Sequence, residues 1–280
     1  MSMNDFDYNA IYYRVIDRDP ENSRYNYDLE EMEIITTRIG VVKSAETHFE
    51  FDDMNGVAQW LYLGTKVRCL KIPVGSNILY NKSFSQGGCY RYSSDCVELL
   101  DILELEDFLG LLASNPHTQD VALHIAHHKF SGNVQLPTSL YSLNLTHCDF
   151  SQLKPPLHLH LLTIIADGED WSWNFKHLSL MRLCLIGFEF ENVQFPQCHE
   201  ISLSSCIIFS SVFGDDTESM SCSHCLMSHV SFPREAKLFA SACVLEDCVL
   251  PIQNNVSVGS ISWQCELLNS RTHSKLKGTI

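Results

Sequence analysis

The chain has 280 residues, of which 45% are hydrophobic, enough for one large domain or two smaller ones, and this excludes disorder throughout. Its formal charge of -15, from 34 acidic residues against 19 Lys and Arg, argues against nucleic acid as a partner, because binding phosphates needs clustered cations. The sequence has no run of about 18 uncharged apolar residues and no secretory leader pattern. We therefore expect an intracellular, cytoplasmic protein with no membrane partner.

Residues 1–114 show no repeat and predict a small α+β domain. A short helix is expected at 52–63, because acids begin this segment and Gly64 follows it. β-branched and aromatic residues, interrupted by turn residues, indicate strands. The expected strands lie at 10–16, 34–42 and 65–73, and a last extended piece begins at Tyr90.

The segment 97–112 predicts an amphipathic helix, with leucines and Phe108 on one side and acids elsewhere. It comes directly before the first repeat. Because the apolar end of a solenoid must be covered by an atypical element, this position indicates a capping helix.

Several short motifs in the first 110 residues resemble a known domain. They are Tyr12-Tyr-Arg-Val, Trp60-Leu-Tyr-Leu-Gly, Val67-Arg-Cys-Leu-Lys-Ile-Pro and Cys89-Tyr-Arg-Tyr-Ser-Ser-Asp-Cys-Val-Glu-Leu-Leu. Together they are similar to an uncharacterised domain that precedes repeats in proteins of large DNA viruses of amoebae. Thr47-His-Phe-Glu-Phe departs from the Gly-Gly-Leu-Tyr-Phe-Thr-like run usual there. The resemblance implies a viral protein, located in the host cell or virion, and transfers no activity.

A repeated spacing organises residues 115–280. Two apolar residues alternate around a polar one, as in a strand with one buried face, and a turn residue follows three positions later. The turn residues are spaced about 18 to 20 apart, with one degenerate unit around Leu183-Cys-Leu185. The apolar pairs with their turn residues are Leu123/Ile125 with His128, Leu143/Leu145 with Cys148, Leu162/Ile164 with Asp167, Ile201/Leu203 with Cys206, Met220/Cys222 with Cys225, Leu238/Ala240 with Cys243, and Val256/Val258 with Ile261.

This period lies in the leucine-rich-repeat range. The sequence therefore predicts an α+β N-terminal domain followed by a mostly β, irregular leucine-rich-repeat-like solenoid of about eight short units. Few helical runs separate the strands, so the outer side of each unit is expected to be extended or 3₁₀.

Cys222-Ser-His-Cys225 is the motif closest to a metal site, since paired thiolates two residues apart suit zinc. A structural zinc site needs a second pair, however, and Cys225 shares its register with Cys148, Cys206 and Cys243. We therefore expect stacked, reduced cysteines in the core, and no metal or other cofactor.

No catalytic residues are predicted, because the sequence has neither a nucleophile elbow nor a phosphate-binding glycine loop. Trp171 and Trp173, with Asp167, Glu169 and Asp170 before them, form the candidate partner-binding cluster, because aromatic residues near acids are common at protein contacts. The same indoles could instead fill a gap where the repeat slips.

The favoured function is protein–protein interaction through the strand face of the solenoid, with a protein partner. The alternative is an enzyme, ADP-ribosyltransferase-like, with its site in residues 1–114 and repeats that select the target. A pocket lined by a buried carboxylate with a perturbed pKa would favour the alternative.

Overall fold

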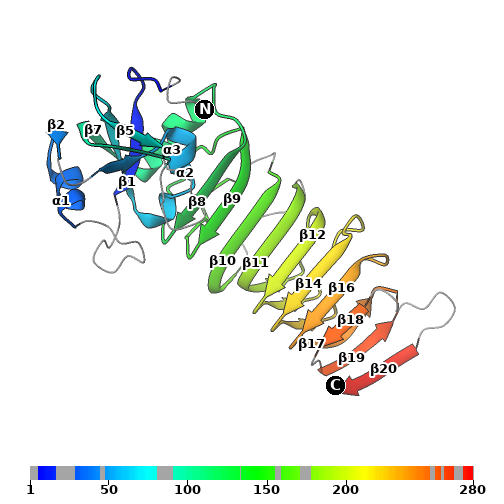
Figure 1. Cartoon of the computed structure of the whole chain (residues 1–280). Coiled ribbons are helices and arrows are strands. Elements are labelled where there is room, and N and C mark those ends of the chain that lie inside the picture. Colours follow the sequence, from blue (N-terminus) through cyan, green and yellow to red (C-terminus); the bar gives the residue numbers. More distant parts are fainter. Residues whose placement is uncertain are drawn as a thin grey trace. The chain divides into compact units, whose positions relative to one another are not determined.

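The computed structural model describes residues 6–16, 29–44, 48–80, 91–132, 134–154, 159–170, 178–252, 256–259, 262–267 and 274–279. Two compact units make up the chain (Figure 1). The first comprises Met1–Ser139 with Gln152–Lys154, and the second comprises Leu140–Ser151 with Pro155–Ile280.

The first unit is built on two small antiparallel sheets. One has the strand order β1-β4-β7-β2, and the other has the order β3-β6-β5. Their shared core contains Phe49, Phe51 and Leu99, all fully buried. The strands are β1 Tyr12–Ile16, β2 Gly40–Lys43, β3 Phe49–Phe51, β4 Lys66–Lys71, β5 Ile78–Tyr80, β6 Tyr92–Ser94 and β7 Cys96–Glu104.

Short helices lie between these strands and after β7. They are α1 Leu29–Thr37, α2 Met54–Ala58, the 3₁₀ turn η2 Leu61–Leu63, and α3 Leu105–Ser114. The next strand, β8 Val121–Ala126, belongs to the same unit and packs against α2 and η2. The ring of Tyr62 on η2 stacks on His124 of β8, with 4.2 Å between the centroids.

Two predictions for this unit are wrong. A strand was predicted at 34–42, but residues 34–37 form the last turn of helix α1. Ile35 is buried on one side of that turn. Residues 97–104 form strand β7, and the helix comprises only Leu105–Ser114. β7 pairs with both β2 and β4. Its buried residues Val97 and Leu99 are two positions apart, which is the spacing of one face of a strand and not of a helix.

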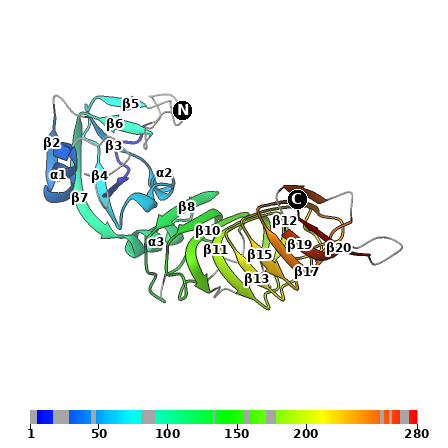
Figure 2. The same cartoon turned by 90° about the horizontal axis from the view of Figure 1, so that it is seen from below.

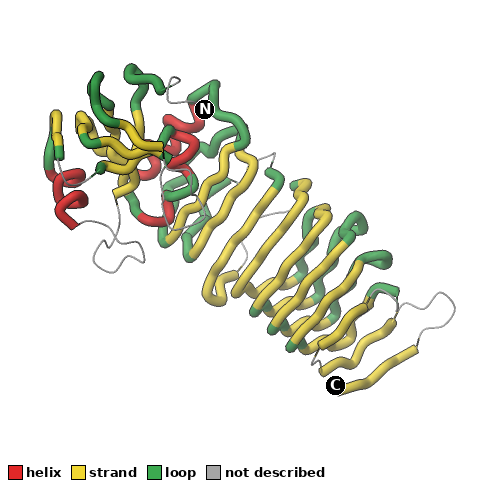
Figure 3. Tube along the Cα trace, viewed as in Figure 1, coloured by secondary structure: helices red, strands yellow, loops and turns green. Residues whose placement is uncertain are grey.

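The second unit is a parallel β-solenoid of about six turns (Figures 1 and 3). Its first sheet has successive strands in register, with Leu185 beside Leu203, which lies beside Cys222. Every apolar pair of the repeat described there, from Leu143 to Ala240, points inward and is buried. The strands are β9 Leu140–Thr146, β10 Leu161–Asp170, β11 Ser179–Glu191, β12 Gln197–Ser204, β14 Ser219–Ser223, β16 Lys237–Ser241 and β18 Val256–Gly259.

A second parallel sheet forms the outer side of the turns (Figure 2). It starts at the end of β11 and continues through β13 Ile207–Phe209, β15 Leu226–Ser228, β17 Val244–Leu250 and β19 Ser262–Leu267. The predicted extended outer side is thus confirmed. A third line of isolated parallel bridges joins Gln194, Val212, Ser231 and Val249. β20 Ser274–Thr279 pairs antiparallel with β19.

Left-handed residues turn the chain from the first sheet to the second. Ser205, His224 and Ala242 have φ of 52°, 54° and 52°, a conformation that costs L-residues about 1–2 kcal/mol. The cysteine that follows each of them points inward, and its S–H donates to a carbonyl two residues earlier. These Sγ–O distances are 3.3 Å for Cys206 to Ser204, 3.2 Å for Cys225 to Ser223, and 3.2 Å for Cys243 to Ser241.

The solenoid is confirmed, but its class is a β-helix, with about six turns where about eight units were expected. From the end of β11 onward, a second line of strands and a third line of isolated bridges close the described turns, in place of the wider outer connections of a leucine-rich repeat. The unit with Leu123 and Ile125 belongs to the first compact unit. Among the described helices, none is long and apolar enough to cross a membrane.

Candidate binding surface

The outward side of the second sheet presents two rows of side chains, which we call the second-sheet face. Parallel pairing sets each row, since residues opposite one another in successive strands stack in register. One row is Glu189, Ile207, Leu226 and Val244. The other is Glu191, Phe209, Ser228 and Glu246.

The register of this face follows from strand alternation. Ile208, Met227 and Leu245 point into the coil and are buried, so the residue on each side of them points outward. A second left-handed corner then ends each strand, at Ser210 and His229 with φ of 46° and 56°. The orientation of the face is therefore fixed by the backbone.

The centre of the second-sheet face is apolar and exposed. Leu226 is 37% exposed, Val244 43% and Phe209 40%, and Ile207 is half-buried beside them. Single exposed apolar side chains are ordinary on protein surfaces. A row from three successive turns is different, because contiguous exposed apolar patches mark interaction sites.

The edges of this face are acidic. Glu189 and Glu191 lie on the turn before the apolar row, and Glu246 and Asp247 lie on its last turn, all exposed. The segments that build the face, 187–191, 206–211, 225–229 and 243–247, contain these four acids and no Lys or Arg. The surface therefore offers an apolar centre within a negative field.

The outward side of the first sheet is chemically different. Hydroxyl groups stack along it, with the Oγ of Ser223 donating to the Oγ of Ser204 at 3.0 Å. Its charges pair across the rungs, since Arg182 Nη2 lies 2.7 Å from an oxygen of Glu200. Three exposed apolar side chains are described on it, Tyr141, Met181 and Phe239, and the ring of Tyr141 stacks on His160 with 4.9 Å between the centroids. Met181 and Phe239 lie three rungs apart, so its described residues form no row of aliphatic side chains.

Part of the predicted partner-binding cluster lies outside the described residues. Trp171 and Trp173 fall there, and Asp167, Glu169 and Asp170 are described as backbone of β10. Asp170 pairs with Glu189, which places its backbone next to the first row of the second-sheet face. The sequence prediction missed Ile207, Leu226 and Val244 because exposed and buried apolar residues look alike until the corners are known.

The cysteine pair Cys222 and Cys225 lies inside the coil. Hydrogen bonds with Cys206 and Cys243, together with burial, raise the pKa of the Cys225 thiol, and burial raises the pKa of the Cys222 thiol. The same hydrogen bonds lower the pKa of the Cys206 thiol to about 7 and that of the Cys243 thiol to about 6, so within this set the proton stays on Cys225. The ten described cysteines are free, and the described residues contain no group of three or more His, Cys, Asp or Glu arranged to hold a metal.

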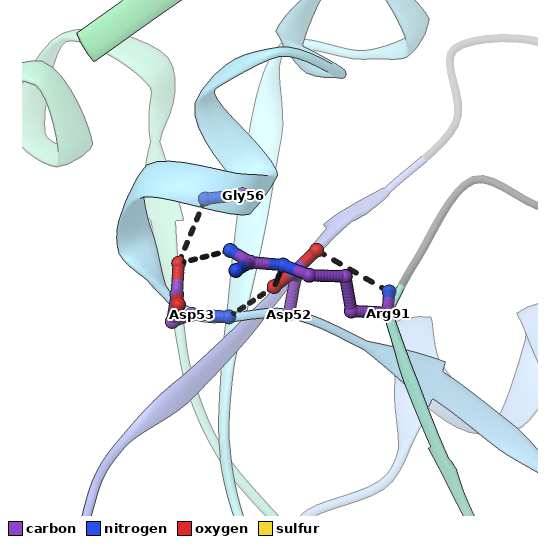
Figure 4. A network of polar contacts seen from close by, with 4 residues as sticks. All are labelled: Asp52, Asp53, Gly56 and Arg91. Atoms are coloured by element: carbon purple, nitrogen blue, oxygen red, sulfur yellow. Dashed lines mark hydrogen bonds and ion pairs between the residues drawn. The ribbon is translucent and has the colours of Figure 1, made fainter. Parts of the chain in front are cut away.

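The first unit contains a buried ion-pair network (Figure 4). Asp52 is fully buried, and its Oδ1 accepts hydrogen bonds from Arg91 Nε at 2.7 Å and from the Asp53 amide at 2.8 Å. Arg91 also reaches the Oδ1 of Asp53 at 2.7 Å, and that same oxygen caps helix α2 through the amide of Gly56. A side chain at position 56 would collide with the Asp52 carboxyl group.

Burial raises the pKa of Asp52 to about 6, although Arg91 and the backbone amides act in the opposite direction. A raised carboxyl pKa is typical of catalytic acids. Here, however, the side chain is closed to solvent and three N–H donors already occupy it. The backbone of Asp52 also bridges to Tyr13. The network joins α2, β1 and Arg91, which is a structural role.

Two shallow surface depressions are also present. One lies against the loop Asp215–Glu218, with Glu235 and Lys237, and the other lies between Glu106 and Ser131. Neither includes Asp52. In the second, Glu106 is fully engaged, since it accepts from the amide and hydroxyl of Ser131 at 2.7 and 2.5 Å.

The class defined by these features is a parallel β-solenoid that follows a region of small antiparallel sheets. No family model matches the chain, and the comparisons with curated proteins and with solved structures give no match. The resemblance of the first 110 residues to a viral domain thus receives no support from relatives.

Proposed function

We propose that the chain is a protein-interaction module whose solenoid binds a protein partner, with the second-sheet face as its principal contact. One observation carries this proposal: Ile207, Leu226 and Val244 form an apolar row over three consecutive turns, with Leu226 and Val244 exposed and Ile207 half-buried. Burying such a row on binding removes apolar area from water, which is the main driving force of protein association.

The surroundings of the row favour a specific protein contact. The interface core between proteins is apolar and its rim is polar, as are the centre and edges of this face. The rigid backbone of the coil also limits the entropy lost on binding, because strands and hydrogen-bonded corners hold the side chains in place. The acids at its edges oppose nucleic acid and anionic lipid as ligands.

An enzyme with its site in residues 1–114 is the weaker proposal. Its main support would be Asp52, which is enclosed and engaged by Arg91. A catalytic acid must reach the atom that it protonates, and a fully buried carboxyl group does not.

The proposal is tested by quantitative co-purification from a cell extract with three forms of the full chain. Leu226→Asp places a charge in the apolar row, and Met181→Asp places the same charge on the first sheet at a side chain of similar exposure. For the proteins that the wild type captures, we expect the captured amount to fall about tenfold or more with Leu226→Asp and to stay unchanged with Met181→Asp. Equal loss with both variants, or with neither, would contradict the proposal.

A further inference from the structure

The second-sheet face also indicates what kind of segment the partner presents. We infer that it is a basic amphipathic α-helix, lying along the solenoid axis across the row of Ile207, Leu226 and Val244. This inference rests on the proposed function and adds the chemistry and conformation of the ligand.

The spacing of the row favours a helix. Successive strands of a sheet lie about 4.8 Å apart, so the three apolar side chains repeat at that distance along the axis. A helix laid along them repeats one side chain every turn, about 5.4 Å, a difference of about 0.6 Å per rung. An extended peptide in the same direction repeats its side chains at about 6.6 Å on one face and loses register within two rungs.

Phe209 extends the apolar surface to one side of the row. It lies two residues beyond Ile207 on the same face of β13 and is 40% exposed. The next position of its own row, Ser228, is small and buried. The apolar surface beside the main row therefore comes from Phe209, and a helix that lies along the row can contact both. An amphipathic helix offers this arrangement through residues at i, i+3, i+4 and i+7.

Charge selects a basic helix. Glu189 and Glu191 precede the apolar row, and Glu246 and Asp247 lie at its other end, three rungs away, which is about 14 Å. A helix of about ten residues spans that distance. Lys or Arg near both of its ends would lie close to these carboxylates, and complementary charge steers association and sets orientation.

A designed peptide tests this inference directly. The probe is a fluorescently labelled 16-residue peptide with Leu at positions 5, 8, 9 and 12, Lys at positions 2, 6, 13 and 16, and Ala elsewhere. Its binding to the full chain is measured by fluorescence anisotropy at physiological ionic strength. A scrambled peptide of the same composition and a counterpart with Glu for every Lys serve as controls. We expect the probe to bind at least about tenfold more tightly than either control.

Protein variants distinguish the face from general electrostatic attraction. Leu226→Asp makes the chain more negative, so attraction by net charge alone would strengthen binding of the basic peptide. We expect the opposite, a weakening of about tenfold or more, because the apolar row is interrupted. Phe239→Asp makes the same charge change at an exposed position of the first sheet and should alter binding by less than about twofold.

The possible outcomes separate the two proposals. Equal binding of the probe and the scrambled peptide, or probe binding that survives Leu226→Asp, overturns the helix inference. If the co-purified proteins still depend on Leu226 in that case, the proposed function stands with a ligand of different shape. If the co-purified proteins do not depend on Leu226 either, both the proposed function and the helix inference are wrong. Thermal melting of each variant accompanies the measurement, and Leu226→Ser replaces Leu226→Asp if the latter unfolds.

Discussion

Asp52 and Arg91 are separated by 39 positions in the chain, and their contact holds a buried charge in the first unit. Arg91 lies in one of the short motifs quoted for the resemblance, but nothing in that motif indicates that it pairs with Asp52. Nor does its motif indicate the partners of Arg68, which is buried and donates to the carbonyls of Ile35 and Leu100 at 2.7 and 2.6 Å. Such long-range polar contacts follow from the tertiary fold and have no local pattern.

Replacing Arg91 should lower the free energy of unfolding, because the buried Asp52 carboxylate loses its counter-ion. Arg91→Met leaves the Asp52 carboxylate without its cation and should lower the free energy of unfolding at pH 7 by about 3 kcal/mol, near the low end for buried pairs because Arg91 itself is partly exposed. Lys66→Met, which breaks the exposed pair with Glu104, is the control and should cost less than about 1 kcal/mol. Chemical denaturation of both variants measures the difference.

The effect of Arg91→Met should also depend on pH. The folded-state pKa of Asp52 is raised from 3.8 to about 6, so the folded protein holds this proton more tightly than the unfolded chain does. The contribution of Asp52 to stability is thus most favourable below about pH 4 and falls as pH rises to about 6. Without Arg91 this pKa rises further, so the variant should lose more stability at pH 7.5 than at pH 5. An equal loss at both values would contradict a buried, ionised Asp52.

At the scale of elements, the strands of the coil were predictable and β7 was not. The strands of the first sheet place apolar residues inward at alternate positions, and a cysteine marks the corner after β9, β12, β14 and β16, so pattern and structure agree there. β7 reads as a helix because leucines also occur three and four residues apart in 97–104. Pairing with β2 and β4 decided its structure, and partners distant in sequence are not visible in a local pattern.

The inward and outward assignments predict different costs of truncation. Leu203 is 1% exposed on the inner side of β12, so Leu203→Ala should lower the free energy of unfolding by about 2–5 kcal/mol. Leu226→Ala removes the same atoms from the second-sheet face and should cost less than about 1 kcal/mol. Denaturant titration of the two variants compares them. Similar costs would mean that the outward row is part of the core.

At the scale of the whole molecule, the repeat predicted the solenoid but not its class. A period of about 18 to 20 residues fits both a leucine-rich repeat and a three-sided β-helix. The distinguishing feature is a second left-handed corner, at Ser210, His229 and Asp247 of successive turns. Polar residues are common in turns of every kind, so their presence in the sequence does not indicate such a corner. The candidate face depends on that second corner, and so it emerged only from the structure.

Site-specific photo-crosslinking is the most direct test of partner binding through the second-sheet face. p-Benzoylphenylalanine would replace Leu226 in one form of the full chain and Phe239 in another, so that each sheet carries one probe at an exposed position. After irradiation in a cell extract, we predict a discrete crosslinked protein with the probe at 226 and none of the same mass with the probe at 239. Crosslinking of that protein from 239 but not from 226, or equally from both, would contradict the account.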